Sequence, residues 1–492
     1  MERSSGILLP ISSLPSKYGI GTLGREAYRF ADALKAAGQT YWQVLPLGPT
    51  SYGDSPYQSF STFAGNPYFI DLELLAEDGL LSAADLEAED WGDTPRYVDY
   101  GKIYAARFRV LRRAFAAGYP RDREAVEQFI RENHWVRDYA LFMALKNHFG
   151  MKSWLEWEDR EIALHHPKAV VQYTRLLAED IRFYIYLQYL FFRQWKELKT
   201  YINGLGIRVI GDLPIYVALD SADVWAEPEF FQLDSDNRPV EVAGVPPDYF
   251  SADGQLWGNP LYDYDRMQKD GFGWWIRRVE GASRLFDVVR IDHFRGLESY
   301  WAVPYGETTA RNGRWRKGPG MALVGVLTSW FHQLHFIAED LGFLTPAVHQ
   351  LLADSGLPGM KVLEFAFDPR EPSNYLPHTY TPNCICYAGT HDNETLLQWE
   401  AGADAETLAY AREYLGIGED EPLNWAILRA GMRSVAGTFV AQMQDYLELG
   451  EEGRMNEPGT TEGNWRWRLL PGELDDALIE TIARCTRLYG RS

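Results

Sequence analysis

The stretch Phe286-Asp287-Val288-Val289-Arg290-Ile291-Asp292 is a short, mainly apolar run that ends in a carboxylate. Seven other short apolar runs likewise end in a polar or a Gly/Pro-containing corner. Such runs, mostly rich in Val, Ile and Leu, are typical of parallel strands that are buried on both faces. We therefore predict eight strands, at 5–10, 41–46, 207–214, 286–292, 335–340, 360–365, 385–390 and 439–442.

Helical patterns follow several of these runs. In 24–38, Ala27, Phe30 and Leu34 share one face of a helix, and Gly38 marks its end. Strands that alternate with helices in this way predict the α/β class and, with eight strands, a (β/α)8 TIM barrel.

The intervals between the predicted strands are uneven. Residues 47–206 separate the second strand from the third, and their apolar residues mostly follow helical spacing. Residues 215–285 separate the third strand from the fourth and are rich in Pro, Gly, Asp and aromatic residues. We predict one barrel over 1–492 with two insertions on its rim. The first is a mainly helical subdomain, and the second is a loop-rich subdomain that carries a lid over the site.

The composition limits the choice of partner. The formal net charge is −21, from 48 Lys and Arg against 69 Asp and Glu. Nucleic acids and anionic membrane surfaces are bound by clustered Lys and Arg, so we expect neither as a partner. A neutral substrate suits this charge. The 17 Trp, 29 Tyr and 24 Phe suit a carbohydrate enzyme, because aromatic rings stack on sugars, but they equally suit a large core.

The chain carries few other signals of chemistry or targeting. Its three cysteines, Cys384, Cys386 and Cys485, have no metal-site company and are expected to be free thiols in a reducing cytosol. The N-terminus has no signal-peptide pattern, and the most apolar stretch, 184–192, is too short to span a membrane. With no phosphate loop, dinucleotide fingerprint or metal cluster, we predict a cytoplasmic protein without a required cofactor.

Three carboxylates follow predicted strands. Asp292 ends the fourth strand, Glu339 lies at the end of the fifth, and Asp392 follows the seventh. Side chains at these carboxyl ends converge on one pocket at the top of a barrel. A single acid at a strand end is more often a helix N-cap or a surface residue. Three acids in register, with Arg290, His293 and His391 beside them, favour a catalytic site.

The same three acids suit cleavage of a glycosidic bond with retention. This reaction needs a carboxylate nucleophile and a carboxylic acid about 5 Å apart. Arg290 shares a strand face with Asp292 and is expected to keep it ionised, unless the two form only a structural ion pair. Glu339 needs a raised pKa, which neighbouring negative charges could supply. His293 and His391 could instead be satisfied core histidines.

Several blocks resemble the signature blocks of amylomaltases, the 4-α-glucanotransferases of the α-amylase clan. The three blocks around the acids are 290–296 (RIDHFRG), 338–342 (AEDLG) and 389–393 (GTHDN). Further blocks similar to that family run from end to end: 51–57 (SYGDSPY), 211–217 (GDLPIYV), 244–250 (GVPPDYF), 254–262 (GQLWGNPLY), 454–460 (RMNEPGT) and 464–468 (NWRWR).

This resemblance implies roles for individual residues. Asp292 would be the nucleophile, Glu339 the general acid/base and Asp392 the transition-state stabiliser. The residues that would contact sugar are Ser55, Tyr57, Asp212, Trp257, Arg290, His293, Asp368, His391 and Asn464. Blocks 244–250 and 254–262 resemble the family's mobile loop. Because only 24 residues follow Arg468, we expect no C-terminal β-sandwich domain, as in amylomaltases.

Three functions remain open from the sequence. The favoured one transfers an α-1,4-glucan segment to glucose or a maltooligosaccharide through a covalent intermediate. The second is an amylase-type hydrolase, which uses the same acids with water as acceptor. The third is a glucan-binding protein without activity, which would need aromatic residues but not three convergent acids.

Overall fold

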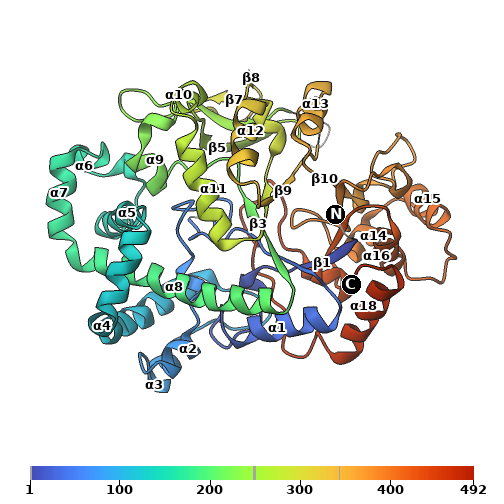
Figure 1. Cartoon of the computed structure of the whole chain (residues 1–492), viewed down its shortest axis with the longest axis horizontal. Helices are drawn as coiled ribbons and strands as arrows, with labels where there is room; N and C mark the ends of the chain where they lie inside the picture. The colour runs from blue at the N-terminus through green and yellow to red at the C-terminus, as the bar shows by residue number, and fades with distance from the viewer. Residues whose placement is uncertain (1–2, 52, 248–250, 343) are drawn as a thin grey trace.

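The computed structural model describes residues 3–51, 53–247, 251–342 and 344–492. Its centre is an eight-stranded parallel sheet in the order β10-β11-β12-β1-β2-β3-β6-β9 (Figure 1). All eight predicted strands are confirmed, with ends that move by a few residues. Their bounds are β1 (Ser4–Leu8), β2 (Tyr41–Gln43), β3 (Arg208–Leu213), β6 (Val288–Ile291), β9 (His335–Ala338), β10 (Gly359–Val362), β11 (Cys384–Tyr387) and β12 (Thr438–Gln442).

The two ends of this sheet meet and complete a (β/α)8 barrel. The backbone N–H of Ala338, in β9, donates to the carbonyl oxygen of Pro358, just before β10, at 2.9 Å. Beside it, the side chain of Asp340 accepts from the N–H of Met360 at 2.6 Å. A Cβ on Gly359 would lie 2.7 Å from Asp340 Oδ2, so this close approach requires glycine. A side chain therefore replaces part of the ladder where the barrel closes.

Helices cover the outside of the barrel (Figure 1). The predicted helix at 24–38 is α1 (Arg25–Ala36), and its apolar face is buried. There Phe30 packs edge-on against Trp42 of β2, with ring centroids 4.8 Å apart. The α-helices after β3 are α9 (Ala222–Ala226), α10 (Tyr264–Lys269), α11 (Gly273–Leu285), α12 (Met321–Trp330), α13 (Pro346–Ser355), α14 (Leu396–Gly402), α15 (Ala405–Leu415), α16 (Leu423–Arg433), α17 (Met443–Tyr446) and α18 (Asp476–Leu488).

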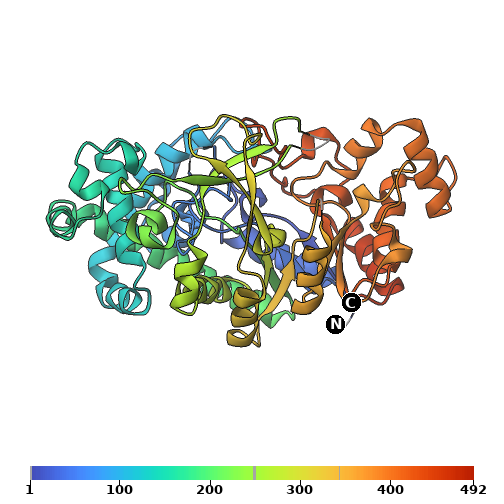
Figure 2. The ribbon, with the colours of Figure 1, turned by 90° about the horizontal axis from the view of Figure 1, so that it is seen from above.

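The long interval between β2 and β3 is mainly helical. Figures 1 and 2 show α4 to α7 grouped at one end of the molecule, while α8 runs back along the barrel. Trp195 of α8 donates from its indole N–H to the carbonyl oxygen of Leu285, which joins that helix to α11. The helices are α2 (Leu72–Glu77), α3 (Ala83–Glu87), α4 (Tyr100–Glu132), α5 (Val136–His148), α6 (Arg160–Ala163), α7 (Pro167–Leu176) and α8 (Ala178–Gly204).

The interval between β3 and β6 differs from the loop-rich expectation, because it contributes two strands to a second sheet. That sheet is antiparallel, in the order β5-β4-β7-β8. Trp257, expected on a loop, lies within β5, and residues 248–250 of the expected lid lie outside the described residues. The strands are β4 (Glu241–Val245), β5 (Gln255–Pro260), β7 (Ser299–Pro304) and β8 (Arg314–Lys317).

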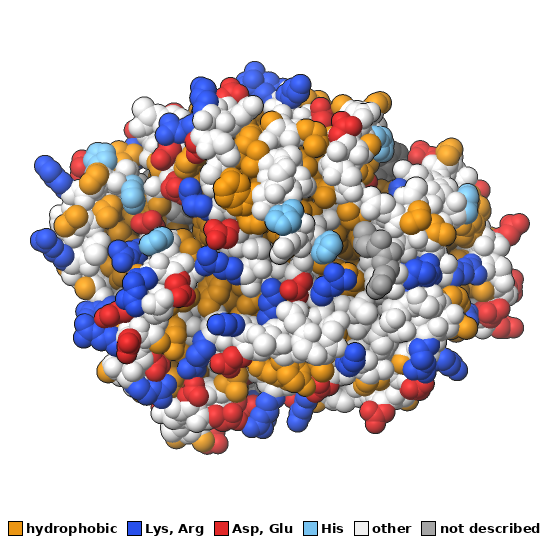
Figure 3. Space-filling model, viewed as in Figure 1, with side chains coloured by type: hydrophobic (Ala, Val, Ile, Leu, Met, Phe, Trp, Pro, Cys, Tyr) orange, Lys and Arg blue, Asp and Glu red, His pale blue; other side chains and the backbone are white. Residues whose placement is uncertain are grey.

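The two chain ends lie side by side in both ribbon views (Figures 1 and 2). The buried guanidinium of Arg491 donates to the carbonyl oxygens of Ser4 at 2.9 Å and Met432 at 2.6 Å, so it ties β1 to the last helices. On the face that Figure 3 shows, Lys and Arg side chains are interspersed with Asp and Glu. No helix in the described part of the chain is both long and apolar enough to cross a bilayer.

The closure of the barrel gives a stability prediction. Asp340→Ala leaves the buried N–H of Met360 without a partner, so the free energy of unfolding should fall by about 1–3 kcal/mol. Asp340→Asn keeps an acceptor oxygen and should lose much less. Denaturant unfolding of the three proteins measures the difference. Equal stability of the alanine and asparagine variants would show that this hydrogen bond does not hold β9 against β10.

Candidate active site

Two of the predicted acids occupy matching positions on neighbouring strands. Ile291 pairs with Ala338 at the carboxyl ends of β6 and β9, and Asp292 and Glu339 are the next residues along. The N–H of Glu339 donates to the carbonyl oxygen of Ile291 at 3.0 Å, which continues this register. Because the register is fixed, Asp292 and Glu339 lie side by side at the carboxyl ends of adjacent strands, as expected.

Arg290 lies among carboxylates inside the barrel. Its Nη1 is 2.6 Å from both carboxylate oxygens of Asp212 and 3.1 Å from Oδ1 of Asp292. The side chains of Arg290 and Asp212 are almost completely buried. On its other side, Nε of Arg290 donates to the thioether sulfur of Met360 at 3.3 Å. The guanidinium thus joins β3, β6 and β10 at the level of the acids.

Burial controls the protonation of the central pair. It raises the pKa of Asp292 to about 7, while Arg290 lowers it and Asp212 and Glu339 raise it. Burial also raises the pKa of Glu339. The expected cause for Glu339 was neighbouring negative charge, but burial is the larger effect and Asp340 adds to it. Arg290 lowers the pKa of both acids and contacts Asp292 directly, and two backbone N–H groups that donate to Glu339 lower the pKa of that acid as well.

The backbone at His293 and Leu341 donates two hydrogen bonds to the carboxyl group of Glu339. His293 has a left-handed conformation, with φ of 48°, which is uncommon for a residue other than glycine. Its N–H donates to Oε2 of Glu339 at 2.7 Å, and the N–H of Leu341 donates to Oε1 at 2.8 Å. The His293 ring packs edge-on against Trp257, with centroids 4.9 Å apart. Burial lowers the pKa of His293 to about 3, so its ring is neutral.

Asp392 has a different electrostatic environment. Oδ1 accepts from the amide of Asn456 at 2.6 Å, and Oδ2 lies 3.4 Å from Nε2 of His391. Partial desolvation by the surrounding site opposes the shift, but His391 and Asn456 together lower the pKa of Asp392 to about 2. The carboxylate is 48% exposed, whereas the imidazole of His391 is buried. Asp392 therefore stays ionised while it faces an open part of the site.

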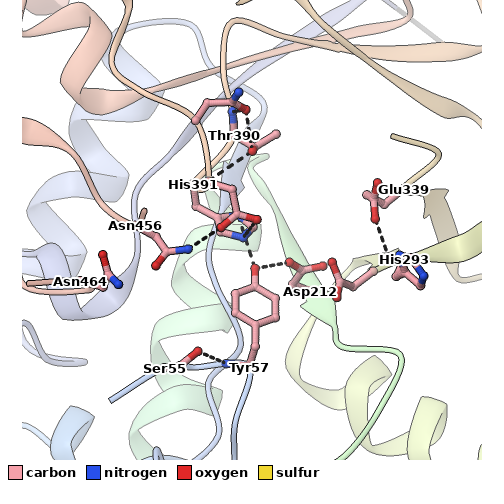
Figure 4. Close-up of polar contacts among 12 residues, drawn as sticks. Ser55, Tyr57, Asp212, His293, Glu339, Thr390, His391, Asn456 and Asn464 are labelled. Carbon is pink, nitrogen blue, oxygen red and sulfur yellow. Dashed lines mark hydrogen bonds and ion pairs between the residues drawn. The ribbon is translucent and has the colours of Figure 1, made fainter. Parts of the chain in front are cut away.

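Tyr57 connects the two sides of the site. Its hydroxyl donates to Oδ2 of Asp212 at 2.6 Å, and its ring stacks on His391 with centroids 5.0 Å apart. Figure 4 shows Tyr57 and Asp212 between Asn456 and His391 on one side and Glu339 and His293 on the other. The ring of Trp465 lies 5.9 Å from that of Tyr57. Tyr57, near the start of the chain, therefore shares one site with Asn456 and Trp465, near its end.

Three of the predicted sugar contacts are held by residues other than the three acids. Ser55 accepts at Oγ from the N–H of Tyr57, at 3.3 Å. Asn464 accepts from the N–H of Glu457 at 2.9 Å and so holds the 457–464 loop. Asp368 pairs with Arg370 at 2.7 Å. None of the three has a described hydrogen bond or ion pair with Asp292, Glu339 or Asp392, and their roles stay predictions.

Three contributors to the site were not singled out from the sequence. Asn456 and Trp465 belong to the two C-terminal blocks, which gave a signal that these segments matter but not which side chains face the acids. The thioether of Met360, as a hydrogen-bond acceptor for Arg290, has no sequence signal. Among the described residues no group of three or more His, Cys, Asp or Glu is arranged to hold a metal ion.

The Arg290 cluster gives a second prediction. Arg290→Met removes the counter-charge of the buried Asp212, so the free energy of unfolding should fall by about 3–5 kcal/mol. Adding Asp212→Asn should recover part of this loss, because the unpaired charge is then removed. Thermal and denaturant unfolding of the single and double variants measure the coupling. Losses that simply add would contradict a direct interaction between the two side chains.

Comparisons with known proteins agree with this geometry. A family model described as 4-alpha-glucanotransferase matches residues 9–473. The 4-alpha-glucanotransferase of Clostridium butyricum is 48% identical over 484 residues, with 98% of this chain and 99% of the relative covered. That of Thermus thermophilus is 50% identical over 501 residues, with 99% of each chain covered.

A solved structure is similar over the whole chain. The amylomaltase from Streptococcus agalactiae, determined in complex with acarbose, has 43% sequence identity and a TM-score of 0.98, with 100% of both chains covered. The amylomaltase from Corynebacterium glutamicum has the same fold at 21% identity, with a TM-score of 0.81 over 98% of this chain and 75% of that one. Asp292 and Glu339 are in register at two strand ends, and His391 and Asn456 lower the pKa of Asp392. This geometry agrees with the relatives, and the chain belongs to the 4-alpha-glucanotransferase family.

Proposed function

We propose that the protein transfers a segment of an α-1,4-glucan to the 4-hydroxyl of an acceptor glucose or glucan, with retention, through a covalent glycosyl-enzyme. The observation that carries this proposal is the pair of acids in register directly after β6 and β9, one of them in contact with Arg290. A retaining reaction needs two carboxyl groups in different protonation states on neighbouring positions.

In the first step Asp292 is the nucleophile. A carboxylate oxygen of Asp292 attacks the anomeric carbon as the glycosidic bond breaks, and Glu339 gives its proton to the leaving oxygen. Arg290 favours the ionised form of Asp292 before the attack. In the second step Glu339 takes the proton of the acceptor hydroxyl, whose oxygen attacks the same carbon and releases Asp292.

Asp392 is the transition-state stabiliser. Its low pKa keeps it negative throughout the cycle. A fixed negative charge that binds sugar hydroxyls favours the oxocarbenium-like transition state. The hydrogen bond from Asn456 fixes the direction in which Asp392 faces the site.

Other residues would bind the substrate. Ser55, Tyr57, Asp212, Trp257, Arg290, His293, Asp368, His391 and Asn464 remain our proposed sugar contacts. Within this set, Trp257 and His293 are in contact, and Tyr57 and Asp212 share a hydrogen bond. Their role is to orient the donor, and for Trp257 also to favour a sugar acceptor over water.

The partners follow from the same chemistry. The donor is an α-1,4-glucan, and the acceptor is glucose or a maltooligosaccharide. The net charge of −21 disfavours nucleic acid and anionic membrane surfaces. The three cysteines are buried free thiols, which suits work in the reducing cytoplasm.

The product pattern from maltotriose tests the function. Transfer should give glucose together with longer oligosaccharides, while the number of reducing ends stays constant. An amylase-type hydrolase would instead raise the number of reducing ends as maltotriose disappears. Chromatography of the products beside a reducing-end assay decides between the two. Mainly hydrolytic products at high donor concentration would contradict the proposed transferase.

The role of Glu339 is tested with two donors. Glu339→Gln cannot protonate a poor leaving oxygen, so turnover of maltotriose should fall by about a thousandfold or more. An α-glycosyl fluoride needs little acid assistance and should still react with Asp292 at a rate within about tenfold of the unmodified protein. An equal loss with both donors would remove Glu339 from the role of acid.

The role of Trp257 is tested by the choice of acceptor. Trp257→Ala removes a ring that packs edge-on against His293, which should weaken acceptor binding and admit water. The ratio of hydrolysis to transfer should rise several-fold, while total turnover falls. Reducing ends measured against chain-length redistribution, beside a melting curve, give the answer. A lower melting temperature with an unchanged ratio would leave Trp257 with a packing role only.

A further inference from the structure

A buried arginine of α11 lies close to the strand end that carries Asp212. Arg278 is 1% exposed, and its guanidinium carbon lies 5.0 Å from the ring centroid of Trp275. Arg278, Asp212 and Tyr57 line the same cavity. The proposed mechanism does not use Arg278, and none of the sequence blocks that resemble the family contains it. The cation next to the site therefore has no task in that mechanism.

Arg278 donates to four neutral oxygens in the described part of the chain. Its Nε donates to the hydroxyl of Thr62 at 2.8 Å. Its Nη1 donates to the carbonyl oxygen of Ile215 at 2.9 Å and to the hydroxyl of Tyr262 at 3.0 Å. Its Nη2 donates to the carbonyl oxygen of Pro214. Because a guanidinium is a planar fork of N–H donors, it holds these acceptors in one fixed arrangement.

Each of the four acceptors follows a proposed sugar contact by two to five residues. The pairs are Pro214 and Ile215 after Asp212, Thr62 after Tyr57, and Tyr262 after Trp257. Since β3 ends at Leu213, the two carbonyl groups lie beyond the sheet, and a buried carbonyl group needs a partner. One guanidinium therefore supplies these partners and joins three segments that are distant in the chain.

Tyr262 continues the connection towards Trp257. Its hydroxyl donates to the carbonyl oxygen of Ile215 at 2.8 Å, which Arg278 also contacts. Its ring stacks on that of Tyr216, with centroids 6.0 Å apart. The ring of Tyr216 in turn packs against Trp257, with centroids 6.3 Å apart. A continuous series of contacts therefore runs from the guanidinium to Trp257.

Thr62 makes the corresponding connection towards Tyr57. Besides its bond with Arg278, its N–H donates to Oδ2 of Asp223, in α9, at 2.8 Å. Tyr57 itself donates to Oδ2 of Asp212 at 2.6 Å, as Figure 4 shows. Two of the connected segments thus meet again at the site, and hydrogen bonds at both ends of the connection set their relative position.

We propose that Arg278 is a positioning residue that fixes the sugar contacts Asp212, Tyr57 and Trp257 relative to one another. In this role it does not touch the sugar and acts only through its four acceptors. A misplacement of about 1 Å near a reacting centre can cost about a hundredfold in rate, so such a connection matters for turnover. This inference rests on the proposed role of the three residues in binding the glucan.

The test measures turnover and product choice in variants that each remove one acceptor of Arg278. Thr62→Val loosens the segment of Tyr57, so kcat should fall about threefold to tenfold with maltotriose and with an α-glycosyl fluoride alike. Its ratio of hydrolysis to transfer should stay within about twofold of that of the unmodified protein. Tyr262→Phe loosens the segment of Trp257, so this ratio should rise about threefold or more. Arg278→Met removes all four bonds and should show both changes.

Trp195→Phe is the matched control, assayed like the other variants in the full chain and well below its melting temperature. It removes a different buried bond to α11, the one to the carbonyl oxygen of Leu285. The melting temperature should fall, while kcat and the product ratio stay within about twofold. If this control changes kcat or the ratio as much as the other variants do, a general loss of stability explains the effect, and the positioning role is overturned.

Two results overturn the positioning role directly. One is that Trp257→Ala raises the ratio of hydrolysis to transfer but folded Tyr262→Phe does not. The other is that folded Thr62→Val keeps kcat within about twofold of the unmodified protein. If Trp257→Ala itself leaves the ratio unchanged, the proposed role of Trp257 fails, and the kcat of Thr62→Val alone decides the role of Arg278. Should Arg278→Met not fold, Thr62→Val and Tyr262→Phe decide by the same criteria.

Discussion

The buried guanidinium of Arg290 lies between the carboxylates of Asp212 and Asp292, and the site is arranged around it. A cation inside a barrel must be neutralised by nearby acids. In turn, acids that lie so close together can be ionised only because the cation is beside them. This mutual need fixes β3 against β6, and the contact with Met360 extends it to β10. Tyr57 joins the cluster through its hydrogen bond to Asp212, which attaches the segment after β2 to the site.

From this cluster outward, the three acids differ because their surroundings differ. Asp292 has the direct contact with Arg290, Glu339 is buried with a raised pKa, and Asp392 is held ionised by His391 and Asn456. In the proposed mechanism, these differences separate three carboxyl groups of similar intrinsic acidity into a nucleophile, an acid and a fixed negative charge. The geometry of the barrel brings the three acids together, and their local environments differ.

The sequence predicted the eight barrel strands because strands buried on both faces leave continuous apolar runs, as at 286–292. It missed the antiparallel sheet, because β8 is exposed and mostly charged, and β5 contains glycine and proline. The acids were predictable from their places after strands. Asn456 was not singled out, because its contact with Asp392 joins segments that are distant in the chain and depends on how loops pack. The left-handed backbone of His293 likewise has no sequence signal.

The most direct test of the central claim is to identify the residue that becomes glycosylated. A 5-fluoro-α-glucosyl fluoride slows the breakdown of a glycosyl-enzyme, because the ring fluorine destabilises the oxocarbenium-like transition state while the fluoride leaves easily. After incubation and proteolysis, mass spectrometry of the peptides should place one fluoroglucosyl group on Asp292, and Asp292→Asn should remain unlabelled. A label on Asp392 or Glu339, or equal labelling of the Asp292→Asn protein, would contradict the account.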